Sequence, residues 1–201
     1  MIRILLVLAI SFAAAWALTL DSIDWPLRPG LMGAVLLVAA ALGARAWWER
    51  RRATVGDEPG GPERDAWHAL VGYAAISGHM LGALSKRVDL HLGAGNSLAT
   101  DTWTIIAGSI VAYLIVRSTD RTRDERDKAF HARGDIAGYT TLGVLIFAFA
   151  LYLAFVPPPG LDGFTHFYIA NFLIALIVLS EVIKQLARLL AYARDRKEAA
   201  G

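Results

Sequence analysis

The sequence predicts the all-α fold class: a polytopic membrane helical bundle of six transmembrane helices, paired as three hairpins, with both termini cytoplasmic. Composition, six apolar runs and the distribution of charge carry this prediction. The 201 residues are 56% hydrophobic and 19% charged, with a mean hydropathy of +0.46, which is not the balance of a soluble chain. A crossing needs about 20 apolar residues, so six crossings with their short connections leave no room for a separate soluble domain and exclude a large extramembrane catalytic domain. The absence of cysteine excludes disulfides and thiolate metal sites.

Six apolar runs predict the spans, and each is bounded by a break in the pattern. Proline and glycine mark most of these breaks, as in Pro157-Pro158-Pro159-Gly160. The third run is weaker because it carries His68 and His79, and the fourth is short with a polar start. The predicted spans cover residues 4–20, 31–48, 66–84, 98–116, 136–156 and 164–190.

The positions of lysine and arginine support all six spans and orient them. If every run crosses, 17 of the 20 basic residues lie on one side, and only Arg28, Lys86 and Arg87 lie on the other. Basic residues near span ends accumulate on the cytoplasmic side, so we expect an inner-membrane, multi-pass protein. If the third run lay on the membrane surface instead of crossing, the two basic connections would lie on opposite sides of the membrane, and this asymmetry would be lost. A cleavable signal peptide ending near Ala15-Trp16-Ala17 is an alternative for the first run, although its apolar stretch continues to Leu20.

Two histidines of the third run are the first candidates for function inside the membrane. On a helical wheel, His68 and His79 share a face with small residues, so we expect this face inside the bundle. One interpretation is that they bind a metal, haem or a proton. The other is that each is hydrogen-bonded to a neighbouring helix. They stand about 16 Å apart along a helix, which excludes joint coordination of one ion.

A polar stripe enters the last predicted span. Residues at helical spacing place Asn171, Glu181 and Gln185 on one face, with Lys184 one turn from Glu181. Glu181 lies about 26 Å from the outer end of the run, in the cytoplasmic third, and we expect it to be buried against another span. It is a proton- or ion-responsive carboxylate, a carboxylate that docks the adjacent basic loop, or half of a local pair with Lys184 at the interface.

Residues 124–133 combine both signs of charge just before the fifth run. No proline or glycine interrupts them, so we expect a helix that continues into the span. Exposed ion pairs stabilise a helix by only about 0.3 to 0.5 kcal/mol each, which does not account for such a concentration of charge. We therefore predict a cytoplasmic contact surface made by Asp124, Glu125, Arg126, Asp127, Lys128 and Arg133.

Two segments carry a family resemblance. Asp124-Glu125-Arg126-Asp127-Lys128-Ala129, followed by Ala132-Arg133 and by Ala137-Gly138-Tyr139 opening a span, resembles small prokaryotic membrane proteins classified as a domain of unknown function. Residues 170–181 and the basic tail to Arg196 are similar to the last span of that family. The resemblance covers residues 66–196 and implies a four-span domain there. It leaves residues 1–50 as an added hairpin, 51–65 as a cytoplasmic linker and 197–201 as a tail.

Three functions follow as hypotheses. The family resemblance implies a regulatory or sensory protein, because such proteins often accompany small helix-turn-helix regulators, and we expect a non-enzymatic protein that binds a cytoplasmic partner through its charged loops. The alternatives are a small transporter or channel with a polar intramembrane route, and a membrane enzyme or haem- or metal-binding protein. The sequence shows no recognisable catalytic motif and specifies no cofactor. We expect contact with the lipid bilayer, no direct nucleic-acid binding, and we leave a homo-oligomer open.

Overall fold

A computed structural model describes residues 1–55, 59–86, 96–117, 124–162 and 164–199 of the chain. The regular elements in these ranges are all helices, which confirms the predicted all-α class. They are α1 (Ile2–Ala17), α2 (Pro29–Val55), α3 (Gly61–Ser85), α4 (Ser97–Val116), α5 (Glu125–Phe155), the 3₁₀ turn η1 (Pro158–Leu161) and α6 (His166–Ala199).

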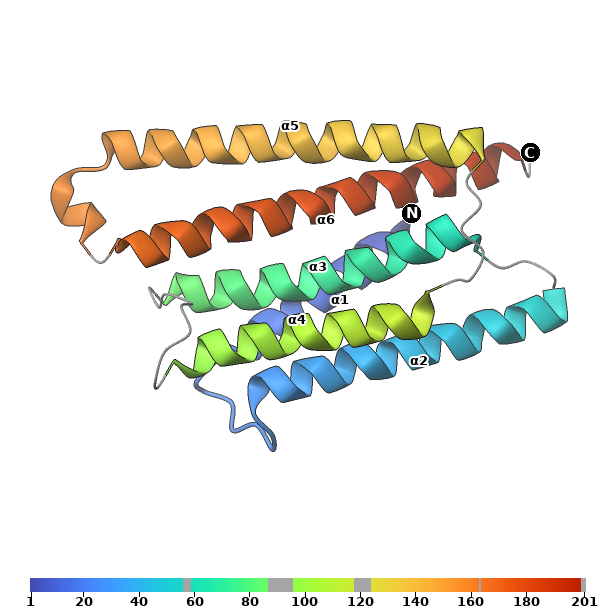
Figure 1. Ribbon diagram of the computed structural model, residues 1–201, viewed down its shortest axis with the longest axis horizontal. Helices are drawn as coiled ribbons and strands as arrows, with labels where there is room; N and C mark the ends of the chain where they lie inside the picture. Colours follow the sequence, from blue (N-terminus) through green and yellow to red (C-terminus); the bar gives the residue numbers. More distant parts are fainter. Residues whose placement is uncertain (56–58, 87–95, 118–123, 163, 200–201) are drawn as a thin grey trace.

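The helices run roughly along one direction and alternate up and down. In Figure 1 they form a row in the order α5, α6, α3, α4, α2, with α1 packed on α3 behind the row. Both termini lie towards the same end of the bundle, together with the starts of α3 and α5. The main neighbour of α1 is α3 and that of α2 is α4, so the first two helices each pack against later ones.

Helix α3 occupies the centre of the bundle because it presents small residues to its neighbours. A Cβ at Gly78 would collide with the backbone of Phe12 in α1, and one at Gly72 would collide with the side chain of Ser109 in α4. Close helix approach of this kind increases packing contacts between spans. The predicted small and polar face of this helix is inside the bundle, since Gly72, Ala75, His79, Gly82 and Ala83 are all buried.

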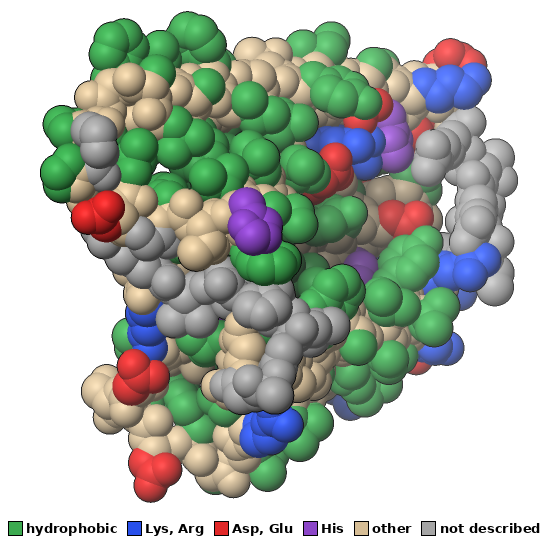
Figure 2. All heavy atoms as spheres, turned by 60° about the vertical axis from the view of Figure 1, so that its left-hand side comes forward, with side chains coloured by type: hydrophobic (Ala, Val, Ile, Leu, Met, Phe, Trp, Pro, Cys, Tyr) green, Lys and Arg blue, Asp and Glu red, His purple; other side chains and the backbone are tan. Residues whose placement is uncertain are grey.

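Four of these helices, α2, α4, α5 and α6, are long and apolar enough to cross a membrane. Helix α1 is apolar but only 16 residues long, and α3 falls outside this group. Helix α3 packs against α1, α4 and α6, and most of its residues are buried inside the bundle. In Figure 2 the α5 edge, at the top, is covered mainly by hydrophobic side chains, with charged ones gathered towards the end where α5 begins.

The two longest helices extend beyond their apolar segments at the end that holds the termini. Helix α5 begins 11 residues before position 136, and α6 continues nine residues past position 190. At 1.5 Å per residue these extensions measure about 16 Å and about 14 Å. They lie side by side, which places the predicted contact segment against the last turns of α6.

Candidate functional site

A buried carboxylate ties the first turn of α3 to the extension of α6. Glu63 is 6% exposed, and one guanidinium nitrogen of Arg196 donates to both of its carboxylate oxygens, at 2.7 and 2.8 Å. The indole N–H of Trp67, one turn further along α3, also donates to Glu63, at 3.4 Å. Charge-assisted bonds of this kind are stronger than neutral ones, so the pair holds the end of α6 against the start of α3.

Two contacts join the same part of α6 to the start of α5. Arg126 donates to Asp195 at 2.8 Å, and the Tyr192 hydroxyl donates to Asp127 at 2.5 Å. The Tyr192 ring also meets Phe130 edge-on, with ring centroids 4.9 Å apart. Because Asp195 precedes Arg196, these contacts and the Glu63 pair form one continuous polar cluster across α3, α6 and α5.

The predicted helical continuation of residues 124–133 is confirmed. Asp124 caps α5 by accepting from the backbone N–H of Asp127, while the Asp127 side chain accepts from the backbone N–H of Asp124. This reciprocal capping box satisfies two amide donors that the helix start leaves open. The hydrogen bond from the Asp127 amide, assisted by Arg126, lowers the pKa of the Asp124 carboxyl.

The six contact candidates divide into two groups. Asp127 is buried and Arg126 is paired with α6, so both hold the segment in place. Asp124, Glu125, Lys128 and Arg133 are exposed, and Lys128 pairs with Glu125 at 2.6 Å on the outer surface. The outward group is therefore the part of the segment that a partner can reach.

A second polar cluster lies between α5 and α6, nearer the apolar segments. Asp135 accepts from Lys184 and Arg188, each at 3.0 Å, and Lys184 also lies 3.5 Å from Glu181. The local Glu181–Lys184 pair considered from the sequence is thus present, with Glu181 partly buried. Gln185 is buried and accepts from Arg188 at 3.2 Å.

Two glycines of α5 make room for these long α6 side chains. A Cβ at Gly134 would lie 2.6 Å from Cγ of Arg188, and one at Gly138 would lie 3.0 Å from Cβ of Lys184. Their spacing of four residues puts both on one face of α5. The side chains of Lys184 and Arg188 can therefore cross the surface of α5 and reach Asp135.

The histidine and asparagine candidates have separate surroundings. His79 is fully buried, and its Nδ1 lies 2.9 Å from the Thr102 hydroxyl of α4. His68 is partly buried, lies towards the other end of α3, and has its ring 5.5 Å from that of Tyr113. Asn171 donates to the carbonyl of Phe167 within α6, at 2.9 Å. The structure does not bring these side chains together.

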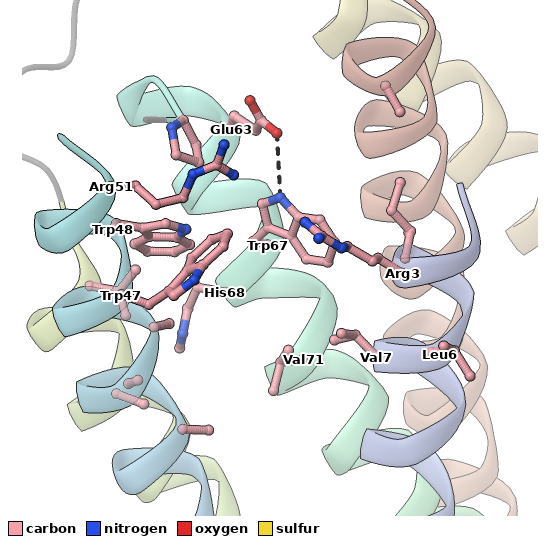
Figure 3. A pocket seen from close by; sticks show the side chains of 18 of the residues that line it. Arg3, Leu6, Val7, Trp47, Trp48, Arg51, Glu63, Trp67, His68 and Val71 are labelled. Carbon is pink, nitrogen blue, oxygen red and sulfur yellow. Dashed lines mark hydrogen bonds between the residues drawn. The ribbon is translucent and has the colours of Figure 1, made fainter. Parts of the chain in front are cut away.

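A groove of about 660 Å³ lies beside the first polar cluster, between α1 and α2. Figure 3 shows Arg3 and Val7 of α1 on one side, Trp47 and Trp48 of α2 on the other, and α3 between them. Glu63 and Arg196 reach its rim, so the groove and the cluster share residues.

Sequence reasoning missed several residues of these sites. Glu63 falls in the predicted linker of residues 51–65, although α3 already begins at Gly61, and Asp135 falls in the predicted helical continuation but is not among the candidates. Tyr192 and Asp195 lie beyond the last predicted span. A search for acids in first helical turns facing basic residues in last turns could have suggested such pairs.

Within the described ranges, no three His, Asp or Glu side chains are placed to hold a metal ion. Comparison with protein-family models, curated proteins and solved structures found no match for this chain. The family resemblance of residues 124–139 and 170–196 therefore stays a prediction.

Proposed function

We propose that the chain is a six-span inner-membrane protein with cytoplasmic termini that acts as a non-enzymatic regulatory or sensory partner. Its contact element is the paired extension of α5 and α6. The rest of the bundle anchors this element at the membrane and fixes its orientation.

The arrangement of α3 supports six spans rather than four. It lies alongside α4 and α6, both apolar enough to cross, and runs between the same two ends of the bundle. Among described basic side chains, only Arg28 and Lys86 lie at the end opposite the termini. The positive-inside rule then favours a cytoplasmic location for both termini.

The observation that carries the regulatory proposal is the division of charge on the α5 extension. Arg126 and Asp127 hold it to α6, and this leaves Glu125, Lys128 and Arg133 exposed on a rigid helix. A surface positioned in this way loses little conformational freedom when a partner binds. A rigid, charged surface outside the apolar segments fits recognition of a cytoplasmic protein better than chemistry on a substrate.

Reporter fusions test the topology. We expect periplasmic-reporter activity for fusions after Asn96 and Pro159, and none for fusions after Pro59 and Glu125. A fusion after Pro59 with the same activity as one after Asn96 would show that α3 does not cross. Activity after Glu125 would reverse the orientation.

Site-specific photocrosslinking in the native membrane tests the contact surface. A photoreactive residue at Ala132, which is exposed on the α5 extension, should form a discrete adduct with a cytoplasmic protein. The same group at Val144, exposed in the apolar part of α5, serves as the control and should not. Reversing Glu125 to Lys and Arg133 to Glu should abolish the adduct, whereas an adduct that survives this change with normal membrane insertion would refute the proposal.

The transporter alternative has less support because the polar candidates lie in different helix interfaces. His79 lies between α3 and α4, while Asp135 and Lys184 lie between α5 and α6. Leu70 and Val182, which belong to the core between α3 and α6, are apolar and buried. A single polar route through the described helices would need these groups at one interface.

A further inference from the structure

The groove between α1 and α2 is lined mainly by apolar side chains that the proposed partner contact does not use. Its volume of about 660 Å³ falls within the range of pockets that hold small ligands, roughly 300 to 1,000 Å³. One stripe of α2 faces it at helical spacing, formed by Leu37, Ala41, Ala44 and Trp48. From Leu37 to Trp48 this stripe extends about 16 Å along α2.

Aromatic rings gather in the groove near the end of the bundle that holds the termini. Figure 3 shows Trp47 and Trp48 on α2, with Trp67 and His68 on α3. Deeper along the groove the lining is aliphatic, as at Val71. Aromatic rings attract one another in offset and edge-to-face arrangements, and this attraction adds to the burial of apolar area. The lining therefore favours a ligand with an aromatic ring over a plain acyl chain.

The charged side chains of the lining do not require a charged ligand. Glu63 and Arg196 are paired with each other. The guanidinium of Arg51 lies 5.1 Å from the centre of the Trp47 ring, within the range of a cation–π contact. Arg3 is exposed at the start of α1. A neutral ligand fits such a groove because it leaves these interactions in place.

His68 is the polar group within the aromatic part of the lining. Its ring donates a hydrogen bond to the backbone carbonyl of Ser109 in α4. A neutral imidazole, the form favoured in an apolar interior, has one donor nitrogen and one acceptor nitrogen. Since the donor is used by Ser109, the other ring nitrogen is an acceptor. A ligand in the groove can therefore bind His68 through a hydroxyl group.

We propose that the groove binds one lipid-soluble phenol. Its ring lies among the indoles of Trp48 and Trp67, its hydroxyl donates to His68, and an apolar tail lies along the α2 stripe. A phenol is neutral at pH 7, because its pKa is about 10, and it combines the ring and the donor that the lining favours. Helices α1 and α2 flank the groove without packing closely on each other, so a molecule dissolved in the bilayer can enter between them.

The groove adjoins the ties that hold the contact element. Trp67 lines it and also donates to Glu63, while Ala193 and Arg196 line it from α6. A ligand that binds only the folded groove stabilises the contacts around it. Occupancy should therefore slow amide exchange in the last turns of α6. This inference names the ligand of the proposed sensory protein, and it rests on the proposed function only for the effect of binding on a partner.

Native mass spectrometry of the full-length protein in detergent tests the ligand class. The probe is para-decylphenol, compared with its methyl ether, which lacks the donor, and with decylcyclohexanol, which lacks the aromatic ring. We expect one decylphenol per chain, and binding about fivefold weaker for each analogue, since one hydrogen bond or one aromatic contact is lost. His68→Phe should bind the phenol and its ether equally. The matched control His131→Phe, outside the groove, should keep the preference.

A second variant fills the groove and leaves His68 in place. Ala44→Trp puts a large ring in the α2 stripe and should abolish binding of decylphenol. Ala39→Trp adds the same ring to an exposed position of α2 outside the lining and should bind as the unaltered chain does. Equal binding of the phenol and both analogues, a preference that survives His68→Phe, or equal loss in the Ala39 control would overturn the proposal.

The crosslinking experiment separates this site from the proposed function. Binding of decylphenol with the expected preference, but no adduct from Ala132, would refute the regulatory role and leave the site intact. An adduct from Ala132 in a protein that does not bind decylphenol would refute the site alone. If both hold, decylphenol should change the yield of the adduct in the unaltered chain and not in Ala44→Trp.

Discussion

Arg196→Gln should destabilise the protein more than Glu63→Gln, although both changes break the same ion pair. The Glu63 side chain is 7% exposed and that of Arg196 is 52% exposed. Removing the arginine leaves a buried carboxylate whose remaining side-chain donor among the described residues is Trp67, at a long distance. Removing the carboxylate leaves a guanidinium that water can reach, so its solvation is largely recovered.

The magnitudes follow from this asymmetry. Loss of one partner from a fully buried pair costs roughly 3 to 5 kcal/mol. Since Arg196 is half exposed, we expect about 2 kcal/mol for Arg196→Gln. Glu63→Gln keeps an amide oxygen as acceptor but loses charge in the first turn of α3, so we expect about 1 kcal/mol. In the double variant the two costs should be non-additive by about 1 kcal/mol.

Reversible unfolding in mixed micelles, followed by circular dichroism, measures these free energies. Amide exchange gives a local readout, because Arg196→Gln should speed exchange in the last turns of α6 before the rest of the bundle responds. Arg194→Gln is the matched control, since Arg194 is exposed on the same helix. The reasoning is refuted if Glu63→Gln is the costlier change, or if Arg196→Gln costs no more than Arg194→Gln.

Three further predictions concern α5. Gly134→Ala should cost about 1 to 3 kcal/mol in thermal unfolding because its Cβ would lie 2.6 Å from a side-chain carbon of α6, whereas Gly143→Ala, with open space around it, should be neutral or stabilising. Tyr192→Phe should cost about 1 to 2 kcal/mol in the same assay by leaving Asp127 without its hydroxyl donor. Asp124→Ala should speed amide exchange in the first turn of α5 at pH 7, and Asp124→Asn should not. In the unaltered chain this protection should stay level from pH 7 to about pH 4, near the unfolded pKa of aspartate, and be lost as the pH falls through the lowered pKa of Asp124.

The sequence was sufficient to predict the helical class, because the apolar runs and their proline and glycine breaks are local signals. The small and polar face of α3 was also predictable, since helical periodicity places Gly72, His79 and Gly82 on one side. Which helices are neighbours was not predictable in this way. Short connections suggest that adjacent runs pair, yet α1 packs on α3 and α2 on α4, because contacts such as Gly78 against Phe12 depend on long-range shape complementarity.

The site was predictable only in part for a similar reason. The local pair of Glu181 and Lys184 follows from helical spacing, but the partner of Lys184 on α5, Asp135, does not. Likewise, Trp47 and Trp67 each fit an interfacial anchor when considered alone. They line one groove because the packing of the bundle brings α2 and α3 together at these positions. No pattern within either segment predicts that the two side chains lie in the same groove.

The concentration of charge in residues 124–133 has two physical uses that the sequence alone could not separate. Asp127 is used within the fold, where it is buried and accepts from Tyr192, while Arg126 pairs with Asp195 of α6 at the surface. Glu125 and Lys128 pair with each other on the exposed surface, where a bond of 2.6 Å is worth at most about 1 kcal/mol. Such a pair is easily exchanged for contacts with another protein, while the buried bond between Asp127 and Tyr192 is not. Recognition of a partner should therefore respond to reversal of the outward charges, and the order of the helix should respond to loss of the inward ones.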